Sequence, residues 1–166
     1  MRPSLQRALT VAVLAGFAAW GYGNLYEAVV FSPNWVVDAG AQMARLDAFF
    51  VRTSPTAYFV PPAFLAPPVL WALAWRNEVP SARRPYRLAS FAAVAAVALN
   101  LAIVAVIIPR LFGPHRASDG EIGAFCWLWN GANGLRVLAV SATVWQVLGA
   151  LRALEGAWTS RSSWTG

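Results

Sequence analysis

The sequence predicts an all-α integral membrane protein, in which residues 1–166 form a single four-helix bundle with both termini in the cytoplasm. Three observations predict this fold class: the composition, the number of long apolar runs and the distribution of arginine. Hydrophobic residues make up 58% of the chain and charged residues only 12%, and nine Trp and nine Phe are present. The mean hydropathy is +0.52. This balance is too apolar for an ordinary soluble domain.

Four predominantly apolar runs are long enough to cross a membrane. A hydrocarbon core about 30 Å thick requires roughly 20 apolar residues of helix. The runs cover residues 8–31, 56–75, 88–108 and 122–151. Together they use most of the chain, so no soluble domain of ordinary size fits beside them. The sequence therefore predicts a multi-pass protein of the cell membrane whose immediate partner is the lipid bilayer.

A cleaved signal peptide is the alternative interpretation of the first run. Arg2 and Arg7 precede it, and small residues occur at Ala18 and Ala19. The apolar stretch nevertheless continues to Phe31, beyond the roughly 7 to 15 residues of a signal sequence, and no convincing cleavage site follows. The run is therefore predicted to remain as a span.

The arginines predict the orientation, because loops rich in Lys and Arg stay on the cytoplasmic side. All 13 basic residues are Arg. Eight fall on the side of the termini: Arg2, Arg7, Arg76, Arg83, Arg84, Arg87, Arg152 and Arg161. Four fall on the opposite side: Arg45, Arg52, Arg110 and Arg116. Topology and anionic lipid therefore account for the pI near 10.7, and no nucleic-acid partner is required.

The sequence offers no metal or cofactor motif. One cysteine, Cys126, and one histidine, His115, are too few for a zinc, haem or iron–sulfur site. His115 lies in the third loop and is interpreted as a solvated residue. No glycine-rich phosphate loop and no Gly-x-Ser-x-Gly motif occurs, and no internal repeat is evident. We therefore expect no cofactor.

Two segments outside the regular spans allow more than one interpretation. The long first loop, residues 32–55, contains a stretch that either forms an amphipathic helix roofing the bundle or is a solvated connector. The second run carries the pairs Pro61–Pro62 and Pro67–Pro68, which remove backbone donors and predict a bend. That bend either walls an internal site, where freed carbonyls are tolerated, or is a packing kink.

Polar residues inside the runs predict a site in the outer half of the membrane. At about 1.5 Å per residue, the following fall at similar depth or slightly deeper: Glu27, Asn100, Asn130, Asn133 and Arg136. Side chains this costly to bury should face the interior and pair, and Glu27 is the one acid within any run. The estimated depths of Glu27 and Arg136 differ by about 10 Å, which favours a link between them through Asn130 and Asn133 or through water. The alternative is that asparagines simply join the helices.

Several short motifs together resemble the anthrone-oxygenase-like family of small membrane proteins. The first run ends YEAVVFSP, the second is rich in proline, the third ends IPR, and the fourth opens WLWNGANGLRVLA. The resemblance covers most of the chain, although the long first loop departs from the family. It implies a cofactor-independent oxygenase that converts the methylene of a lipophilic, polyketide-like aromatic to a carbonyl in secondary metabolism.

The resemblance also implies roles for the polar residues. Glu27 would be the catalytic base, since a buried carboxylate is a stronger base than an exposed one. The donors to developing oxyanions would be Asn24, Asn100, Asn130 and Arg136, with Asn133 on the same face, and the walls against a flat substrate would be Tyr26, Tyr58, Trp127 and Trp129.

Two other classes of function remain open at this point. A non-catalytic accessory or structural subunit would use its polar groups in helix contacts. A small transporter would need a polar path between the two faces, and the inner half of the fourth run is apolar around Val140, Val144 and Leu148. The sequence therefore disfavours transport without separating an enzyme from an accessory subunit. It does not reveal the substrate or the oligomeric state.

Overall fold

The computed structural model describes the backbone of residues 1–52 and 55–162, and the side chains of the same ranges except 55, 56, 58–60 and 160–162. The elements are all helical throughout this described part. In chain order they are α1 (Pro3–Tyr26), η1 (Glu27–Phe31), α2 (Ser32–Trp35), α3 (Ala39–Phe49), α4 (Pro55–Arg76), α5 (Pro80–Ala102), η2 (Ile103–Ile107), α6 (Ile108–Leu111) and α7 (Asp119–Ser162). The prediction of an all-α fold is confirmed.

Three stretches of helix in the described residues are long and apolar enough to cross a membrane. They cover Pro3–Trp35, Pro80–Leu111 and Asp119–Thr159. Each extends beyond its predicted run at both ends, because the helices continue through the more polar residues that flank the apolar ones. These stretches support the interpretation as a membrane protein. Helix α4 begins and ends within one residue of the second predicted run.

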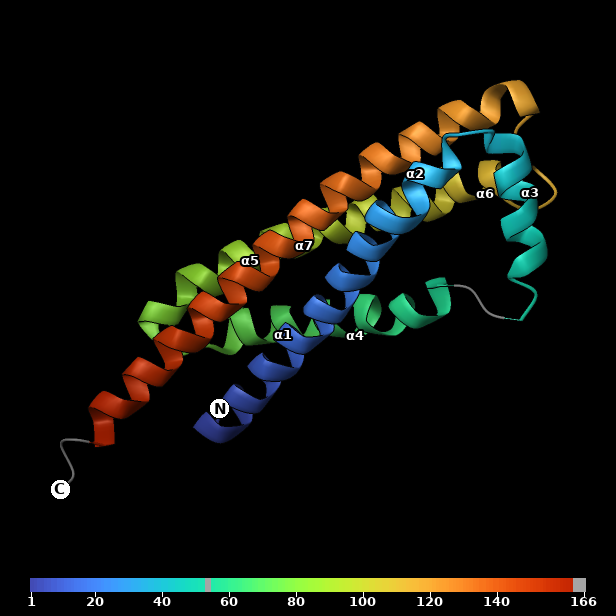
Figure 1. Cartoon of the computed structure of the whole chain (residues 1–166). Coiled ribbons are helices and arrows are strands. Elements are labelled where there is room, and N and C mark those ends of the chain that lie inside the picture. The colour runs from blue at the N-terminus through green and yellow to red at the C-terminus, as the bar shows by residue number, and fades with distance from the viewer. Residues whose placement is uncertain (53–54, 163–166) are drawn as a thin grey trace.

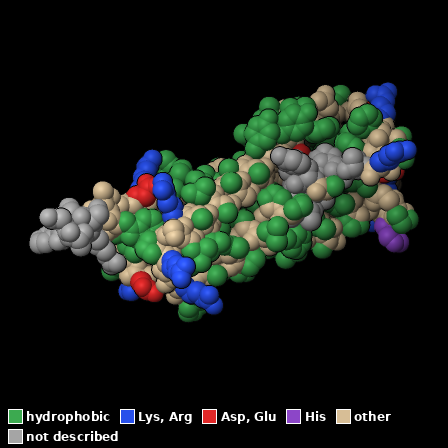
Figure 2. Space-filling view, turned by 90° about the horizontal axis from the view of Figure 1, so that it is seen from below, with side chains coloured by type: hydrophobic (Ala, Val, Ile, Leu, Met, Phe, Trp, Pro, Cys, Tyr) green, Lys and Arg blue, Asp and Glu red, His purple; other side chains and the backbone are tan. Residues whose placement is uncertain are grey.

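The long helices form an antiparallel bundle (Figure 1). Helix α1 packs against α4 and α7, and α5 packs against α7 and α4. The start of α1, the turn from α4 to α5 and the end of α7 lie at one end of the molecule, whereas α3 and α6 lie at the other. Figure 2 shows hydrophobic side chains along the middle of the visible face and charged side chains gathered toward its ends.

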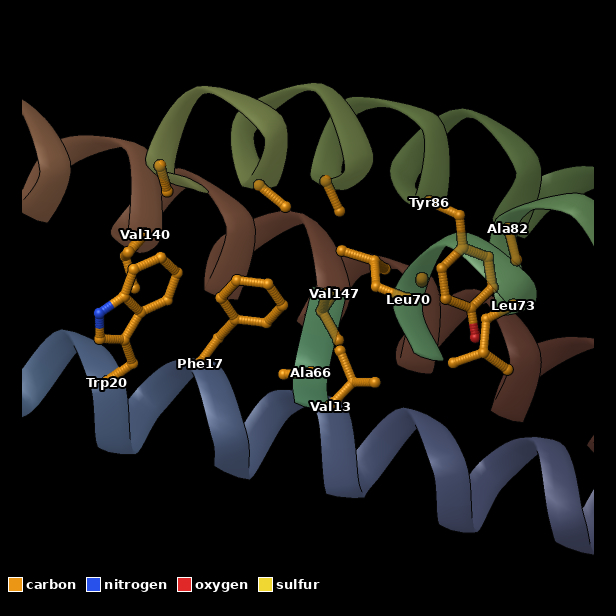
Figure 3. Close-up of a cluster of buried hydrophobic side chains, with 14 of the residues drawn as sticks. Val13, Phe17, Trp20, Ala66, Leu70, Leu73, Ala82, Tyr86, Val140 and Val147 are labelled. Carbon is orange, nitrogen blue, oxygen red and sulfur yellow. The ribbon is translucent and has the colours of Figure 1, made fainter. Parts of the chain in front are cut away.

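Two hydrophobic clusters fill the bundle. The inner cluster joins α1, α4, α5 and α7 through Val13, Phe17, Trp20, Leu70 and Val147, among others (Figure 3). The outer cluster joins the far ends of the helices to α3, whose Met43 is fully buried. Of the two interpretations left open for the first loop, the structure therefore shows the helix, which packs as a roof over the outer cluster. Among the side chains that the structure describes, none from α4 belongs to this outer cluster.

Proline shapes α1 and α5 more visibly than α4. Helix α4 continues through its two proline pairs. By contrast, α1 and α5 each widen into a five-residue π-turn shortly before one proline, Pro33 or Pro109. Proline lacks an N–H group and its ring displaces the carbonyl four residues earlier, and a wider turn relieves both effects. The sequence predicted a bend in the second run, whereas the structure keeps α4 as one helix and has its widened turns in α1 and α5.

The two π-turns belong to a repeated structure. The segments NLYEAVVFSP and NLAIVAVIIP begin at Asn24 and Asn100 and share Asn, Leu, one Val and the final Pro at matching positions. Each follows one long helix and leads into a four-residue helix that contains the proline. This short similarity was overlooked in the sequence. Helices α1 and α5 start at the same end of the molecule (Figure 1), and Asn24 and Asn100 lie near the ends of these two helices.

Candidate functional site

Arg136 of α7 lies at the centre of a buried polar cluster in the half of the bundle nearer α3. Its Nη1 donates to Asn100 Oδ1 at 2.7 Å. Its Nε and Nη2 donate to Asn133 Oδ1 at 3.2 and 2.7 Å. Nη2 also lies 3.6 Å from Oε2 of Glu27, and the two side chains are only 6% and 13% exposed. The guanidinium group therefore links α7 to α5 and to the end of α1.

The contact between Glu27 and Arg136 is direct, which answers how these two groups are linked. Along the helix axis Glu27 and Arg136 were expected to differ by about 10 Å. The structure shows that no intervening group is needed, because the long Arg136 side chain brings its charge to Glu27. Glu27 is also the first residue of η1, so the carboxylate projects from the point where the helix widens.

Asn133 completes the link between α7 and α1. Its Nδ2 donates at 3.1 Å to the backbone carbonyl of Asn24, while its Oδ1 accepts from Arg136. The Asn24 carbonyl also accepts the backbone N–H of Glu27. Backbone and side-chain groups on α1 are thus tied into the same network. Interhelical bonds of this kind replace the water that a membrane interior lacks.

Three buried polar atoms on α1, α2 and α7 have no hydrogen-bond partner among the described residues. They are Asn24 Nδ2, Asn130 Oδ1 and Trp35 Nε1. An unsatisfied buried polar group costs about 1–3 kcal/mol, so each calls for an explanation such as a ligand or water. Two are donors and one is an acceptor. All three belong to the α1–α2 and α7 segments that form one side of the cluster.

Apolar side chains separate this cluster from the polar contacts at the opposite end. There, Thr10 and Tyr86 share a hydrogen bond at 2.6 Å, and Gln6 donates to Asn77 at 2.9 Å. Val13, Phe17 and Trp20 of the inner hydrophobic cluster lie along α1 between Thr10 and Asn24 (Figure 3). The described side chains therefore form no continuous polar route along the bundle.

The predicted site residues divide into those in the cluster and those outside it. Glu27, Asn24, Asn100, Asn133 and Arg136 are joined by the contacts above. Asn130 is partly buried one turn away from Asn133. Trp129 is buried and lies against Trp35, with 4.4 Å between ring centroids. Tyr26 and Trp127 are 45% and 65% exposed and face outward. The side chain of Tyr58 lies outside the described residues.

Trp35 and the π-turns are the parts of the site that sequence reasoning missed. Trp35 was assigned to the loop, although the structure shows it at the end of the continuous helical stretch from Pro3. The signal that would have placed the site is the repeated Asn-Leu with a later Pro. It marks Asn24 and Asn100 as equivalent positions, and both lie in the network around Arg136.

Chemically, the cluster offers one carboxylate, one guanidinium group and several amides in a setting with little water. The Glu27 carboxylate can take a proton from a bound molecule. The unpaired N–H groups of Asn24 and Trp35 can donate hydrogen bonds to the oxygens of that molecule. No group of three or more His, Cys, Asp and Glu side chains that could hold a metal ion occurs in the described part of the chain.

Comparison of the chain with protein-family models, curated proteins and solved structures finds no match. The cluster must therefore be interpreted from its own geometry.

Proposed function

We propose that the chain is a four-span protein of the cell membrane, with α1, α4, α5 and α7 as the spans and both termini in the cytoplasm. Three of these helices have the length and apolarity of spans. Helix α4 connects two of them across the same distance and has 22 residues. The end of the molecule that contains both chain ends also carries most of the arginines, as the positive-inside rule requires.

We further propose that the cluster around Arg136 acts on a lipophilic aromatic molecule, with Glu27 as the base of a cofactor-independent oxygenation. The observation that carries this proposal is the buried Glu27 carboxylate, on a bundle whose helices also hold two buried polar atoms without a partner among the described residues, Asn24 Nδ2 and Asn130 Oδ1. A site used only for packing would be expected to satisfy its own polar atoms. A substrate would reach the site from the hydrocarbon layer.

The proposed reaction converts an acidic methylene to a carbonyl. Glu27 takes one methylene proton, and the resulting carbanion gives its electrons to O₂ to form a C–O bond and a peroxide anion. Glu27 returns the proton to give a hydroperoxide. The hydroperoxide then loses water: its remaining C–H bond and its O–O bond break, the C–H electrons form the second C–O bond of the carbonyl, and the hydrogen leaves with the outer oxygen. The balance is CH₂ plus O₂ to C=O plus H₂O. Asn24 Nδ2 is a free donor for an enolate oxygen.

Arg136 has a different role in this proposal. Its Nε, Nη1 and Nη2 already contact Asn133, Asn100 and Glu27. It therefore positions Glu27 and is not itself a substrate-binding group. The contacts of Arg136 with neighbouring helices also favour a second candidate function. In this alternative the protein is a non-catalytic accessory subunit, and the network only joins helices. The two candidates differ in what they predict for Glu27.

The test is the variant Glu27→Gln, with Glu155→Gln as the matched control because Glu155 is exposed at the other end of α7. The purified protein is mixed with a hydroxylated anthrone, and O₂ uptake and quinone absorbance are measured. We expect turnover by the wild type and the control and at least a 100-fold loss in Glu27→Gln, the lower range for a general base. Retained activity in a folded Glu27→Gln variant would refute the base role.

Copurifying molecules provide an independent readout. Mass spectrometry of organic extracts should find a lipophilic aromatic with the wild type. Failure to find one, together with no turnover by the wild type, would favour the accessory subunit.

A further inference from the structure

A depression of about 750 Å³ opens at the end of the molecule opposite the polar cluster. It lies where α1 begins and α4 ends. Its lining consists of Met1, Arg2, Leu5, Trp75, Arg76, Asn77 and Glu78. None of these residues takes part in the network around Arg136, so the depression is a separate feature.

The base of the depression is fixed by buried hydrogen bonds. Gln6 Nε2 donates to Asn77 Oδ1 at 2.9 Å, and Asn77 Nδ2 donates to the Val79 carbonyl at 2.9 Å. Gln6 and Asn77 are 5% and 6% exposed. These contacts hold the first turn of α1 against the segment that follows α4. The depression therefore has a defined shape in the folded protein.

The charge of the lining is positive. Its one acid, Glu78, lies 3.3 Å from the N-terminal ammonium group of Met1, which offsets it. Arg2 and Arg76 are exposed, and neither forms an ion pair or a side-chain hydrogen bond within the described residues. Two guanidinium groups from different helices thus face a shared depression without an internal counter-ion.

The remaining lining is apolar and unusually exposed. Trp75 is 88% exposed and Leu5 is 50% exposed. An indole ring at a membrane boundary places its apolar face beside lipid chains and its N–H near the headgroups. The depression therefore combines paired cations with an apolar wall, which is the pattern complementary to an anionic amphiphile.

We propose that this depression binds the phosphate-bearing headgroup of an anionic phospholipid. Arg2 and Arg76 contact the phosphate from two sides, and the start of the acyl chains lies along Trp75 and Leu5. Basic pockets between spans on the cytoplasmic side are suited to such headgroups, and arginine binds phosphate through paired N–H donors. The inference rests on the membrane orientation proposed above and is independent of the oxygenase proposal.

The test compares two double variants that remove the same charge from the same end of the molecule. Arg2→Gln with Arg76→Gln alters the depression. Arg83→Gln with Arg84→Gln is the control, because both arginines are exposed in the first turns of α5 and neither lines the depression. Nanodiscs containing phosphatidylcholine with increasing phosphatidylglycerol are used, and bound lipid is counted by native mass spectrometry.

We expect the wild type and the control to retain phosphatidylglycerol in preference to phosphatidylcholine. The double variant of the depression should bind it about 30-fold more weakly, the effect expected for two arginines at the membrane surface. An equal loss in both double variants would overturn the proposal, since it would indicate general surface charge. Displacement of the lipid by millimolar inorganic phosphate would also overturn it, because the site would then be one for free phosphate.

Glu27→Gln supplies the remaining control. It should leave phosphatidylglycerol retention unchanged, so a failure of the oxygenase proposal and a failure of the lipid proposal are distinguishable. Circular dichroism establishes that each variant is folded before lipid is counted.

Discussion

Replacement of Arg136 by Met tests whether the polar cluster is held together by charge or only by hydrogen bonds. The substitution keeps a long side chain but removes every donor. Asn100 Oδ1 and Asn133 Oδ1 lose their 2.7 Å bonds, and Glu27 loses the guanidinium 3.6 Å away. A carboxylate that is 13% exposed would then have no cationic partner in the cluster.

The two explanations predict different losses of stability. If hydrogen bonds alone matter, the two contacts that Arg136 makes with other helices, to Asn100 and to Glu27, contribute about 0.6 kcal/mol each. Arg136→Met would then lower the free energy of unfolding by about 1 kcal/mol. If the unpaired carboxylate matters, removal of one member of a buried pair costs about 3–5 kcal/mol. We expect the larger loss for Arg136→Met. Glu27→Gln should cost only about 1–2 kcal/mol, because Arg136 keeps both asparagine oxygens.

The double variant Glu27→Gln with Arg136→Met separates these contributions. It contains no unpaired charge at the cluster, so it should be more stable than the sum of the single losses predicts, by about 2 kcal/mol. The measurement is reversible unfolding in mixed micelles of detergent and lipid, followed by circular dichroism. Additive losses, or a loss near 1 kcal/mol for Arg136→Met, would refute the view that charge pairing holds the cluster together.

Substitutions at Gly16 and Met43 test the packing of α1 against α4 and of α3 against the outer hydrophobic cluster. Gly16→Leu should destabilise the protein by about 1–3 kcal/mol, because a Cβ at Gly16 meets the Ala66 Cβ at only 3.0 Å. Gly131→Leu is the control and should cost little, because nothing lies within 4 Å of a Cβ at Gly131. Equal thermal midpoints for the two variants would contradict the observed contact of α1 with α4. Met43→Ala should cost about 2–5 kcal/mol through the cavity left under α3. A loss below 0.5 kcal/mol in the same unfolding assay would show that α3 is not a packed roof.

Much of the bundle was predictable because it depends on local pattern. The long apolar runs required helices, and the limits of α4 matched the prediction within one residue. The amphipathic pattern of the first loop allowed the helix that contains Met43, but it did not distinguish that helix from a solvated connector. Hydropathy did not reveal the true helix ends, because a helix continues into flanking polar residues for as long as its backbone hydrogen bonds are satisfied.

The candidate site was only partly predictable. The choice of Glu27, Asn100, Asn133 and Arg136 as residues facing one another agrees with the structure, since costly polar groups in an apolar chain have few other places to go. The aromatic residues were harder. Trp127 and Trp129 are two positions apart, so the helix turns one outward and buries the other. Composition alone does not distinguish them.

The sequence by itself determined the helical class of this protein, the approximate positions of its long helices and the residue types that had to meet inside it. These follow from hydropathy and from the cost of burying charge, which are properties of each segment alone. Only the tertiary structure decided that Arg136 contacts Glu27 directly, that Asn24 and Asn130 retain unpaired atoms, and that α3 covers the outer cluster. Those outcomes depend on the rotation and height of each helix relative to its neighbours, and the packing of the whole chain sets both.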